Sequence, residues 1–180
     1  LAKPAEQTPL IAAQGIAILL EAGVPPGVVQ LLPGQGETVG AQLTGDDRVR
    51  GVMFTGSTEV ATLLQRNIAS RLDAQGRPIP LIAETGGMNA MIVDSSALTE
   101  QVVIDVLASA FDSAGQRCSA LRVLCLQDEI ADHTLKMLRG AMAECRMGNP
   151  GRLTTDIGPV IDSEAKANIE RHIQTMRSKG

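Results

Sequence analysis

Short apolar runs of strand length alternate along this chain with longer segments of helical periodicity, and glycine-rich turns lie between them. The strand-like runs are residues 28–32, 49–54, 79–84, 90–93 and 121–126. Three helical segments are expected at 10–21, 58–72 and about 129–145. Three more are expected between the turn at 34–40 and about residue 45, after residues 95–96, and from residue 163 onward. Parallel strands covered on both faces are apolar throughout, so this alternation predicts a doubly wound, mainly parallel α/β fold.

Serine and glycine mark the predicted helix ends. Gly23 is expected to end the first helix, because the prolines after it cannot continue one. Ser95-Ser96 are expected to cap the fourth helical segment, and Ser163 is expected to cap the last. The best internal boundary lies at Gly86-Gly87, since a glycine pair permits a sharp change of chain direction.

The composition excludes several classes of partner. The chain has two Phe and neither Tyr nor Trp, which argues against stacking on nucleic-acid bases. Its net charge is −4 with both signs interspersed, so no basic stripe is available for nucleic acid or anionic lipid. No apolar run approaches the roughly 18 residues of a membrane span. Three Cys and two His without paired spacing favour free thiols in a reducing compartment and no metal site.

Two glycine-rich turns, at 34–40 and 55–58, could bind phosphate. Small residues let a phosphate approach main-chain N–H groups, and a helix N-terminus adds partial positive charge. Ser57 could serve both as a helix cap and as a donor to the phosphate. Every α/β crossover also needs such turns, so these residues alone leave a purely structural role equally open.

Two further positions carry groups suited to catalysis. Glu84 ends an apolar run, where apolar surroundings would favour its protonated form and so make it a general base near neutral pH. A solvated carboxylate at a strand end fits the same pattern. Cys118 lies in a loop of small residues directly after Arg117, whose positive charge favours the reactive thiolate. Cys125 and Cys145 instead fit the pattern of small buried apolar residues.

Four motifs occur in a fixed order: 3–9 (KPAEQTP), 54–60 (FTGSTEV), 84–87 (ETGG) and 115–118 (GQRC). In this order and spacing the chain resembles the NAD(P)-dependent aldehyde dehydrogenase superfamily over essentially all 180 residues. More narrowly, 83–94 and 111–122 resemble the L-glutamate γ-semialdehyde (1-pyrroline-5-carboxylate) dehydrogenase module of the bifunctional bacterial proline-utilisation A flavoproteins. The resemblance implies part of a Rossmann-type NAD-binding domain in residues 1–85 and part of the thiol-bearing catalytic α/β domain in 86–180.

The resemblance also implies an activity, the NAD-dependent oxidation of L-glutamate γ-semialdehyde to L-glutamate in proline catabolism. Cys118 would be the nucleophile that forms a thiohemiacetal and then a thioester, and Glu84 would activate the water that hydrolyses the thioester. Ser119 would hydrogen-bond the α-carboxylate of this small-molecule aldehyde. Arg117 would either add charge at that carboxylate or favour the Cys118 thiolate, and the sequence does not decide between these two roles.

Family analogy assigns the cofactor residues. Lys3 and Glu6 would contact the adenosine ribose hydroxyls, Gly34 would flank the adenine, and Gly56 with Ser57 would contact the pyrophosphate. An acidic residue at a ribose favours NAD over NADP, because it repels the extra phosphate. FAD is implied only for the separate proline dehydrogenase module of the parent protein.

The chain is expected to be a piece of that parent, since it lacks an initiator Met and several parts of the family pattern. We therefore expect little or no turnover from the chain alone. The resemblance implies a cytoplasmic, homo-oligomeric parent that can include a DNA-binding module and can associate with the membrane when active. Three alternatives stay open: an aldehyde dehydrogenase for another semialdehyde, a non-catalytic structural fragment, and a cysteine hydrolase that uses His133 or His172.

Overall fold

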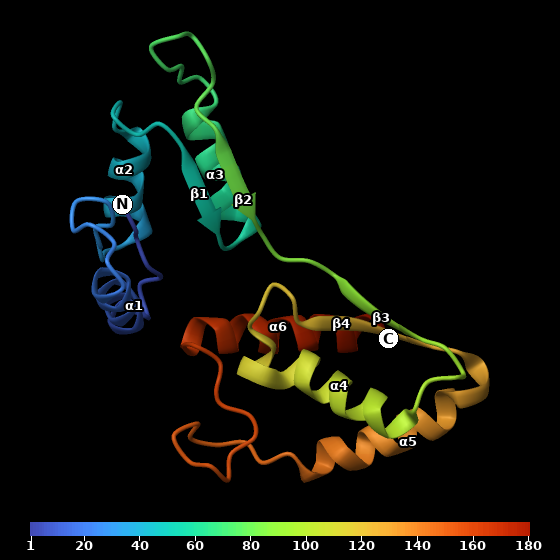
Figure 1. The fold of residues 1–180 in the computed structure, drawn as a ribbon. Helices are drawn as coiled ribbons and strands as arrows, with labels where there is room; N and C mark the ends of the chain where they lie inside the picture. Colours follow the sequence, from blue (N-terminus) through green and yellow to red (C-terminus); the bar gives the residue numbers. More distant parts are fainter. The chain divides into compact units, whose positions relative to one another are not determined.

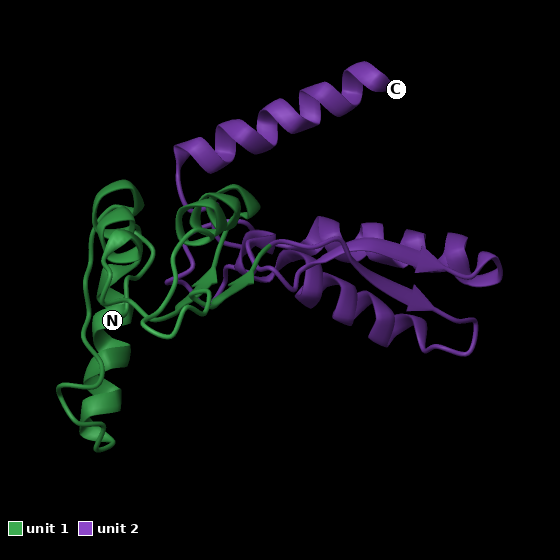
Figure 2. Cartoon of the chain, turned by 90° about the horizontal axis from the view of Figure 1, so that it is seen from above, with its two compact units in different colours: residues 1–85 green, residues 86–180 purple.

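The computed structural model describes residues 1–180, which form two compact units, Leu1–Thr85 and Gly86–Gly180 (Figure 1 and Figure 2). Each unit contains one two-stranded parallel sheet together with helices. The predicted α/β class is therefore confirmed. None of the helices has both the length and the apolar content that crossing a bilayer requires.

The first unit contains four helical segments and two strands. They are α1 (Pro9–Glu21), η1 (Gly36–Gly40, π-helical), α2 (Ala41–Gly45), β1 (Val52–Thr55), α3 (Thr58–Ile68) and β2 (Leu81–Glu84). Gly23 lies just after α1 with φ +95°, as expected for a glycine that ends a helix. Val52 pairs with Leu81 and Thr55 with Glu84, so β1 and β2 end at the same edge of the sheet.

The third helix is shorter than the sequence predicts, because it ends at Ile68 rather than at residue 72. The Arg71 guanidinium donates hydrogen bonds to the main-chain carbonyls of Thr44, Asp46 and Val49 near the end of α2. These contacts satisfy carbonyl groups that the end of a short helix leaves without partners. The chain after α3 therefore turns toward α2 instead of continuing the helix.

The second unit packs two helices against its sheet. Its elements are β3 (Asn89–Val93), α4 (Thr99–Phe111), η2 (Asp112–Gly115, a 3₁₀ turn), β4 (Leu121–Leu126), α5 (Asp128–Glu144) and α6 (Ser163–Lys179). The buried core consists of Val93, Val102, Val106 and Leu121. Leu124, Ile130 and Leu138 are among the partly buried side chains that complete it from β4 and α5.

A bulge at the start of β4 adjusts which side chains face this core. Asn89 pairs with Leu121 and Ala90 with Val123, so Arg122 has no partner in β3. Leu121 and Leu124 would lie on opposite faces of a regular strand, because side chains alternate. The extra residue resets the alternation, so that buried Leu121 and half-buried Leu124 both contact the core.

Two predicted helix caps are wrong, and in both cases an aspartate is the reason. The Asp94 carboxylate accepts a hydrogen bond from the Ser96 main-chain N–H at 2.8 Å, which forms a turn, and α4 begins only at Thr99. At the start of α6 the Asp162 side chain accepts from the Ala165 N–H at 2.8 Å, so Asp162 rather than Ser163 is the cap.

Candidate functional site

Three of the predicted site residues meet at the carboxyl edge of the β1–β2 sheet. Gly56 follows β1, and its N–H donates to the carbonyl of Glu84 at 3.1 Å. Glu84 ends β2 and is exposed, so the structure matches the solvated strand end rather than the expected apolar surroundings. Ser57 caps α3 as predicted, because its Oγ accepts from the Val60 N–H at 3.2 Å. Ligands of open α/β sheets bind at this edge of the strands.

Gly56 has a structural role that the sequence analysis did not identify. A Cβ at this position would lie 2.4 Å from Cζ of Phe54, so the aromatic ring occupies the space that a side chain would need. Its N–H is also used by Glu84. The groups available to a phosphate here are therefore the first N–H groups of α3, which have no partner within the helix, and the Ser57 hydroxyl proton.

A second group of predicted cofactor residues lies around the turn that leads into η1. The Lys3 ammonium donates to the carbonyls of Pro4 and Gly34, both at 2.9 Å. The Glu6 carboxylate accepts from the Gly36 N–H at 2.5 Å. Lys3 thus keeps one N–H donor and Glu6 keeps one carboxylate oxygen for a ligand. The structure thus brings Lys3 and Glu6 to the turn at Gly34 and Gly36, which lies 31 and 30 positions further along the sequence.

Gly34 is required by the backbone at this turn. Its φ is +153°, and a Cβ there would lie 2.4 Å from a methyl group of Val39. Any other residue would force Val39 and the start of the helical segment to move.

In the second unit, Cys118 lies in the turn between η2 and β4, and the residue is exposed. Cys125 in β4 is exposed as well, so the expectation that it is buried is wrong, while Cys145 is half-buried. The turn before Cys118 has an unusual backbone, since Ser113 (φ 55°, ψ 31°), Ala114 (φ 54°, ψ 32°) and Gly115 (φ 68°) are all left-handed. Left-handed backbone is costly for residues with a Cβ and tends to occur at functional sites. The strain, at Ser113 and Ala114, therefore lies five and four residues before the predicted nucleophile.

Three side chains that the sequence analysis did not select hold this segment in place. Gln116 donates from Nε2 to the Ser113 carbonyl at 2.9 Å and accepts from the Ile161 N–H at 2.7 Å. Arg122, the bulge residue, donates to the Gly115 carbonyl at 2.7 Å. Asn89, at the start of β3, donates to the Cys118 carbonyl at 2.7 Å. The contacts of Asn89 with Cys118 and of Gln116 with Ile161 span 29 and 45 positions of sequence, so no local pattern could indicate them.

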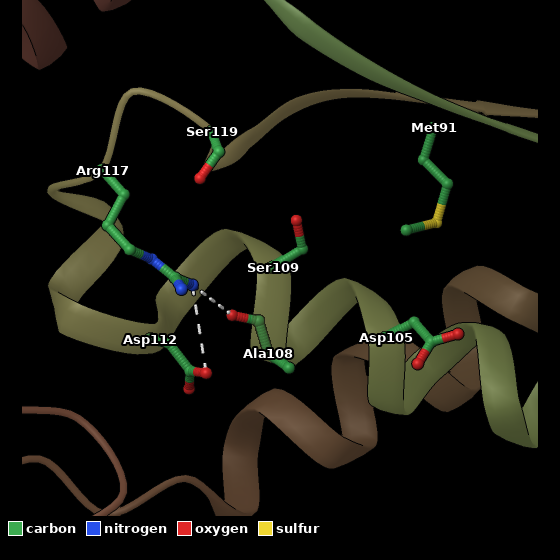
Figure 3. Close-up of a pocket in the computed structure, with 7 residues that line it drawn as sticks. All are labelled: Met91, Asp105, Ala108, Ser109, Asp112, Arg117 and Ser119. Carbon is green, nitrogen blue, oxygen red and sulfur yellow. Dashed lines mark hydrogen bonds and ion pairs between the residues drawn. The ribbon is translucent and has the colours of Figure 1, made fainter.

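Arg117 and Ser119 lie on either side of Cys118 in the sequence and line one wide-open cavity of about 410 Å³, which Cys118 itself does not line (Figure 3). Figure 3 shows the Arg117 side chain extending toward α4, where it donates to the Ala108 carbonyl at 3.0 Å. It also forms an ion pair with Asp112 at 3.9 Å. The guanidinium thus has partners on α4 and η2, and no hydrogen bond joins it to the Cys118 sulfur.

The predicted residues therefore form three groups. Glu84, Gly56 and Ser57 share one sheet edge, while Lys3, Glu6 and Gly34 share one turn. The second unit carries the third group, in which Cys118 is flanked by Arg117 and Ser119.

Known proteins match this chain over its whole length. The sequence profile of the aldehyde dehydrogenase family matches residues 1–180. The chain is 99% identical over 180 residues to the bifunctional protein PutA of Escherichia coli strain K12, and it spans 14% of that protein.

Solved structures give the same result. A mutant of proline utilization A from Bradyrhizobium japonicum is 51% identical with a TM-score of 0.88, over 98% of this chain and 18% of that one. A 1-pyrroline-5-carboxylate dehydrogenase from Thermus with bound NAD is 36% identical with a TM-score of 0.83, over 96% of this chain and 33% of that one. The resemblance noted in the sequence is thus confirmed, and the chain belongs to the aldehyde dehydrogenase family.

Proposed function

We propose that this chain is part of an enzyme that oxidises L-glutamate γ-semialdehyde to L-glutamate with NAD in proline catabolism. The observation that carries the proposal is the match of all 180 residues to the aldehyde dehydrogenase family, with an exposed cysteine in a side-chain-braced turn. The relatives named proline utilization A and 1-pyrroline-5-carboxylate dehydrogenase supply the substrate.

Cys118 is the proposed nucleophile. Its thiolate adds to the aldehyde carbon and produces a thiohemiacetal, whose oxyanion needs hydrogen-bond donors. The Cys118 main-chain N–H donates to no group of this chain, which leaves it available to that oxygen. Loss of hydride from the same carbon then converts the thiohemiacetal into a thioester.

Glu84 is the proposed general base for the second half of the reaction. It takes a proton from water, the hydroxide adds to the thioester carbonyl, and the C–S bond breaks to release glutamate and the Cys118 thiolate. The carboxylate lies at the end of β2, exposed and therefore accessible to water. This division of labour requires no histidine.

NAD, when bound, accepts the hydride. The residues of the first unit suit this cofactor in chemistry: the start of α3 and the Ser57 hydroxyl offer donors to the pyrophosphate. Lys3 and Glu6 keep a donor and an acceptor for ribose hydroxyls. Gly34 would flank the adenine, and Gly56 allows the chain to turn sharply beneath the Phe54 ring.

Ser119 and Arg117 are the proposed contacts to the α-carboxylate of the substrate. Both line one cavity, and a guanidinium has five N–H donors, of which Arg117 uses one for the Ala108 carbonyl. The guanidinium makes no hydrogen bond to the Cys118 sulfur, which favours this role of Arg117 over stabilisation of the thiolate, and the carboxylates of Asp105 and Asp112 line the same cavity.

Residues 1–85 are then part of the NAD-binding domain and 86–180 part of the catalytic domain. The complete protein is proposed to be a cytoplasmic, bifunctional homo-oligomer with FAD in its proline dehydrogenase module. The name of the Escherichia coli relative supports the bifunctional character.

Substitutions in a full-length protein that carries these 180 residues test the proposal. Cys118→Ser should abolish semialdehyde-dependent reduction of NAD, whereas Cys125→Ser should retain it. Glu84→Gln should retain thioester formation, seen as a burst of NADH, but lose steady-state turnover. Full activity of Cys118→Ser would overturn the proposal, and a higher kcat/KM for another semialdehyde would replace the substrate.

The 180-residue chain itself separates the catalytic from the structural alternative. We expect calorimetry to detect NAD binding, and alkylation to modify Cys118 faster than Cys125 or Cys145. Equal labelling of the three thiols without NAD binding would identify a structural fragment.

A further inference from the structure

The carboxamide of Asn89 bridges two main-chain carbonyls of the turn that holds Cys118. Its Nδ2 donates to the Cys118 carbonyl at 2.7 Å and to the Ala120 carbonyl at 3.0 Å. An amide nitrogen has two hydrogens, so both donors are used. Asn89 is half-buried and pairs with Leu121 at the start of the parallel β3–β4 ladder. The anchor therefore extends from the sheet of the second unit to an exposed turn.

The other side-chain restraints of this segment act on neighbours of Cys118, namely Gln116, Arg117 and Gly115. One main-chain hydrogen bond closes the turn, from the Ala120 N–H to the Arg117 carbonyl at 3.1 Å. The bond from Asn89 is the one hydrogen bond that reaches the main chain of Cys118 itself. The segment before it is the left-handed stretch Ser113–Gly115, and the bulge at Arg122 follows. Asn89 therefore connects Cys118, which lies between these two irregular features, to the start of strand β3.

We propose that Asn89 is a positioning residue that sets the backbone orientation of Cys118. A fixed carbonyl at residue 118 and another at residue 120 restrict the peptide planes on the C-terminal side of the thiol. That restriction limits the directions of the Cys118 side chain and of its unpaired N–H. Nucleophilic addition needs both groups in place, since small errors in the attack geometry reduce the rate strongly.

This inference rests on the proposed function, because it assigns Asn89 a role only if Cys118 is the nucleophile. It also differs from a purely structural role at the start of β3. A structural role predicts that loss of the carboxamide lowers stability and NAD binding together with activity. A positioning role predicts that the rate of thioester formation falls while NAD binding and the folded state are retained.

The test uses a full-length protein that carries these residues. In it, Asn89→Leu removes both N–H donors while the new side chain has a size similar to that of asparagine. Asn89→Asp preserves the shape but presents oxygens to the two carbonyls. Asn168→Asp, at an exposed position of α6, is the matched control. Single-turnover kinetics measure the NADH burst, calorimetry measures the Kd for NAD, and circular dichroism measures the melting temperature.

For both Asn89 variants we expect a burst rate at least tenfold lower, a Kd for NAD within twofold, and a KM for the aldehyde within about threefold. The Asn168→Asp variant should match the parent. A burst rate within twofold of the parent, or a parallel loss of NAD binding in both variants, would overturn the proposal. Asn89→Asp decides the test if the leucine variant does not fold. Turnover by Cys118→Ser would instead refute the proposed function.

Discussion

From the left-handed turn before Cys118 we predict that Ala114→Gly stabilises the protein, whereas replacing alanine by glycine usually lowers the free energy of unfolding. Ala114 has φ 54° and ψ 32°, a conformation that costs a residue with a Cβ about 1–2 kcal/mol. Glycine adopts it without this cost but loses about 0.5–1 kcal/mol more backbone entropy on folding. The difference predicts that the free energy of unfolding rises by about 0.5–1 kcal/mol.

Ala108→Gly supplies the control, because Ala108 is exposed within the regular helix α4. In an ordinary helix the same change should destabilise by about 1 kcal/mol. The chain has no Trp or Tyr, so unfolding in urea is best followed by far-ultraviolet circular dichroism. At a slope near 1–2 kcal/mol per molar urea, the two midpoints should shift in opposite directions by about 0.5 M. A lower midpoint for Ala114→Gly would refute the assignment of strain to this turn.

Three further substitutions test particular contacts. Thr134→Val should raise the free energy of unfolding by about 1 kcal/mol, since the Thr134 hydroxyl is buried without a hydrogen-bond partner. As a control, Thr44→Val should lower the free energy of unfolding in the same urea assay, because the Thr44 hydroxyl donates to a carbonyl at 3.0 Å. Arg71→Lys should destabilise by about 2 kcal/mol in that assay, because an ammonium cannot reproduce the guanidinium fork that binds three carbonyls. Hydrogen bonds from the Arg77 main chain and guanidinium hold the pKa of Asp73 below its usual value. This carboxylate therefore stabilises its turn above pH 4 and loses that effect as the pH falls through its lowered pKa, so urea midpoints measured from pH 6 to 3 should decline less for Asp73→Asn.

The sequence predicts the regular elements of this chain well. Four of the five strand-like runs contain strands, because apolar residues without helical periodicity have few alternatives in an α/β chain. The prediction for 28–32 is wrong, since that run forms only an isolated bridge between Leu31 and Ala2. Helix ends are less predictable. Both wrong caps involve a serine next to an aspartate, at positions 94–96 and 162–163, and in each case the aspartate accepts the hydrogen bond. Either residue type can cap a helix, so the choice depends on backbone geometry rather than on the pattern.

Family motifs point to the proposed reactive groups of the site but not to the contacts that would position them. Cys118 and Glu84 stand out because of their chemistry, whereas nothing in the sequence distinguishes Asn89 from an ordinary residue at the start of a strand. Its contacts lie 29 and 31 positions away and depend on how β3 pairs with β4. Arg122 contributes to the turn only because a bulge leaves it outside the ladder. Such contacts follow from tertiary structure, which local periodicity does not specify.

The 180-residue chain exposes more surface than two compact domains of its size would. The chain exposes 13062 Å², whereas two separate compact domains of half its 18.9 kDa mass would expose roughly 10,000 Å² together. Part of the excess is apolar and lies on strands: Met53 is 84% exposed in β1, and Ile92 is 84% exposed in β3. Parallel sheets in globular proteins have both faces covered, so two-stranded sheets with such faces lack the packing that gives a sheet its rigidity. The proposed reaction needs a rigid Cys118 turn and a rigid Glu84 strand end, so these incompletely covered sheets are the physical basis of our expectation that the chain alone gives little or no turnover.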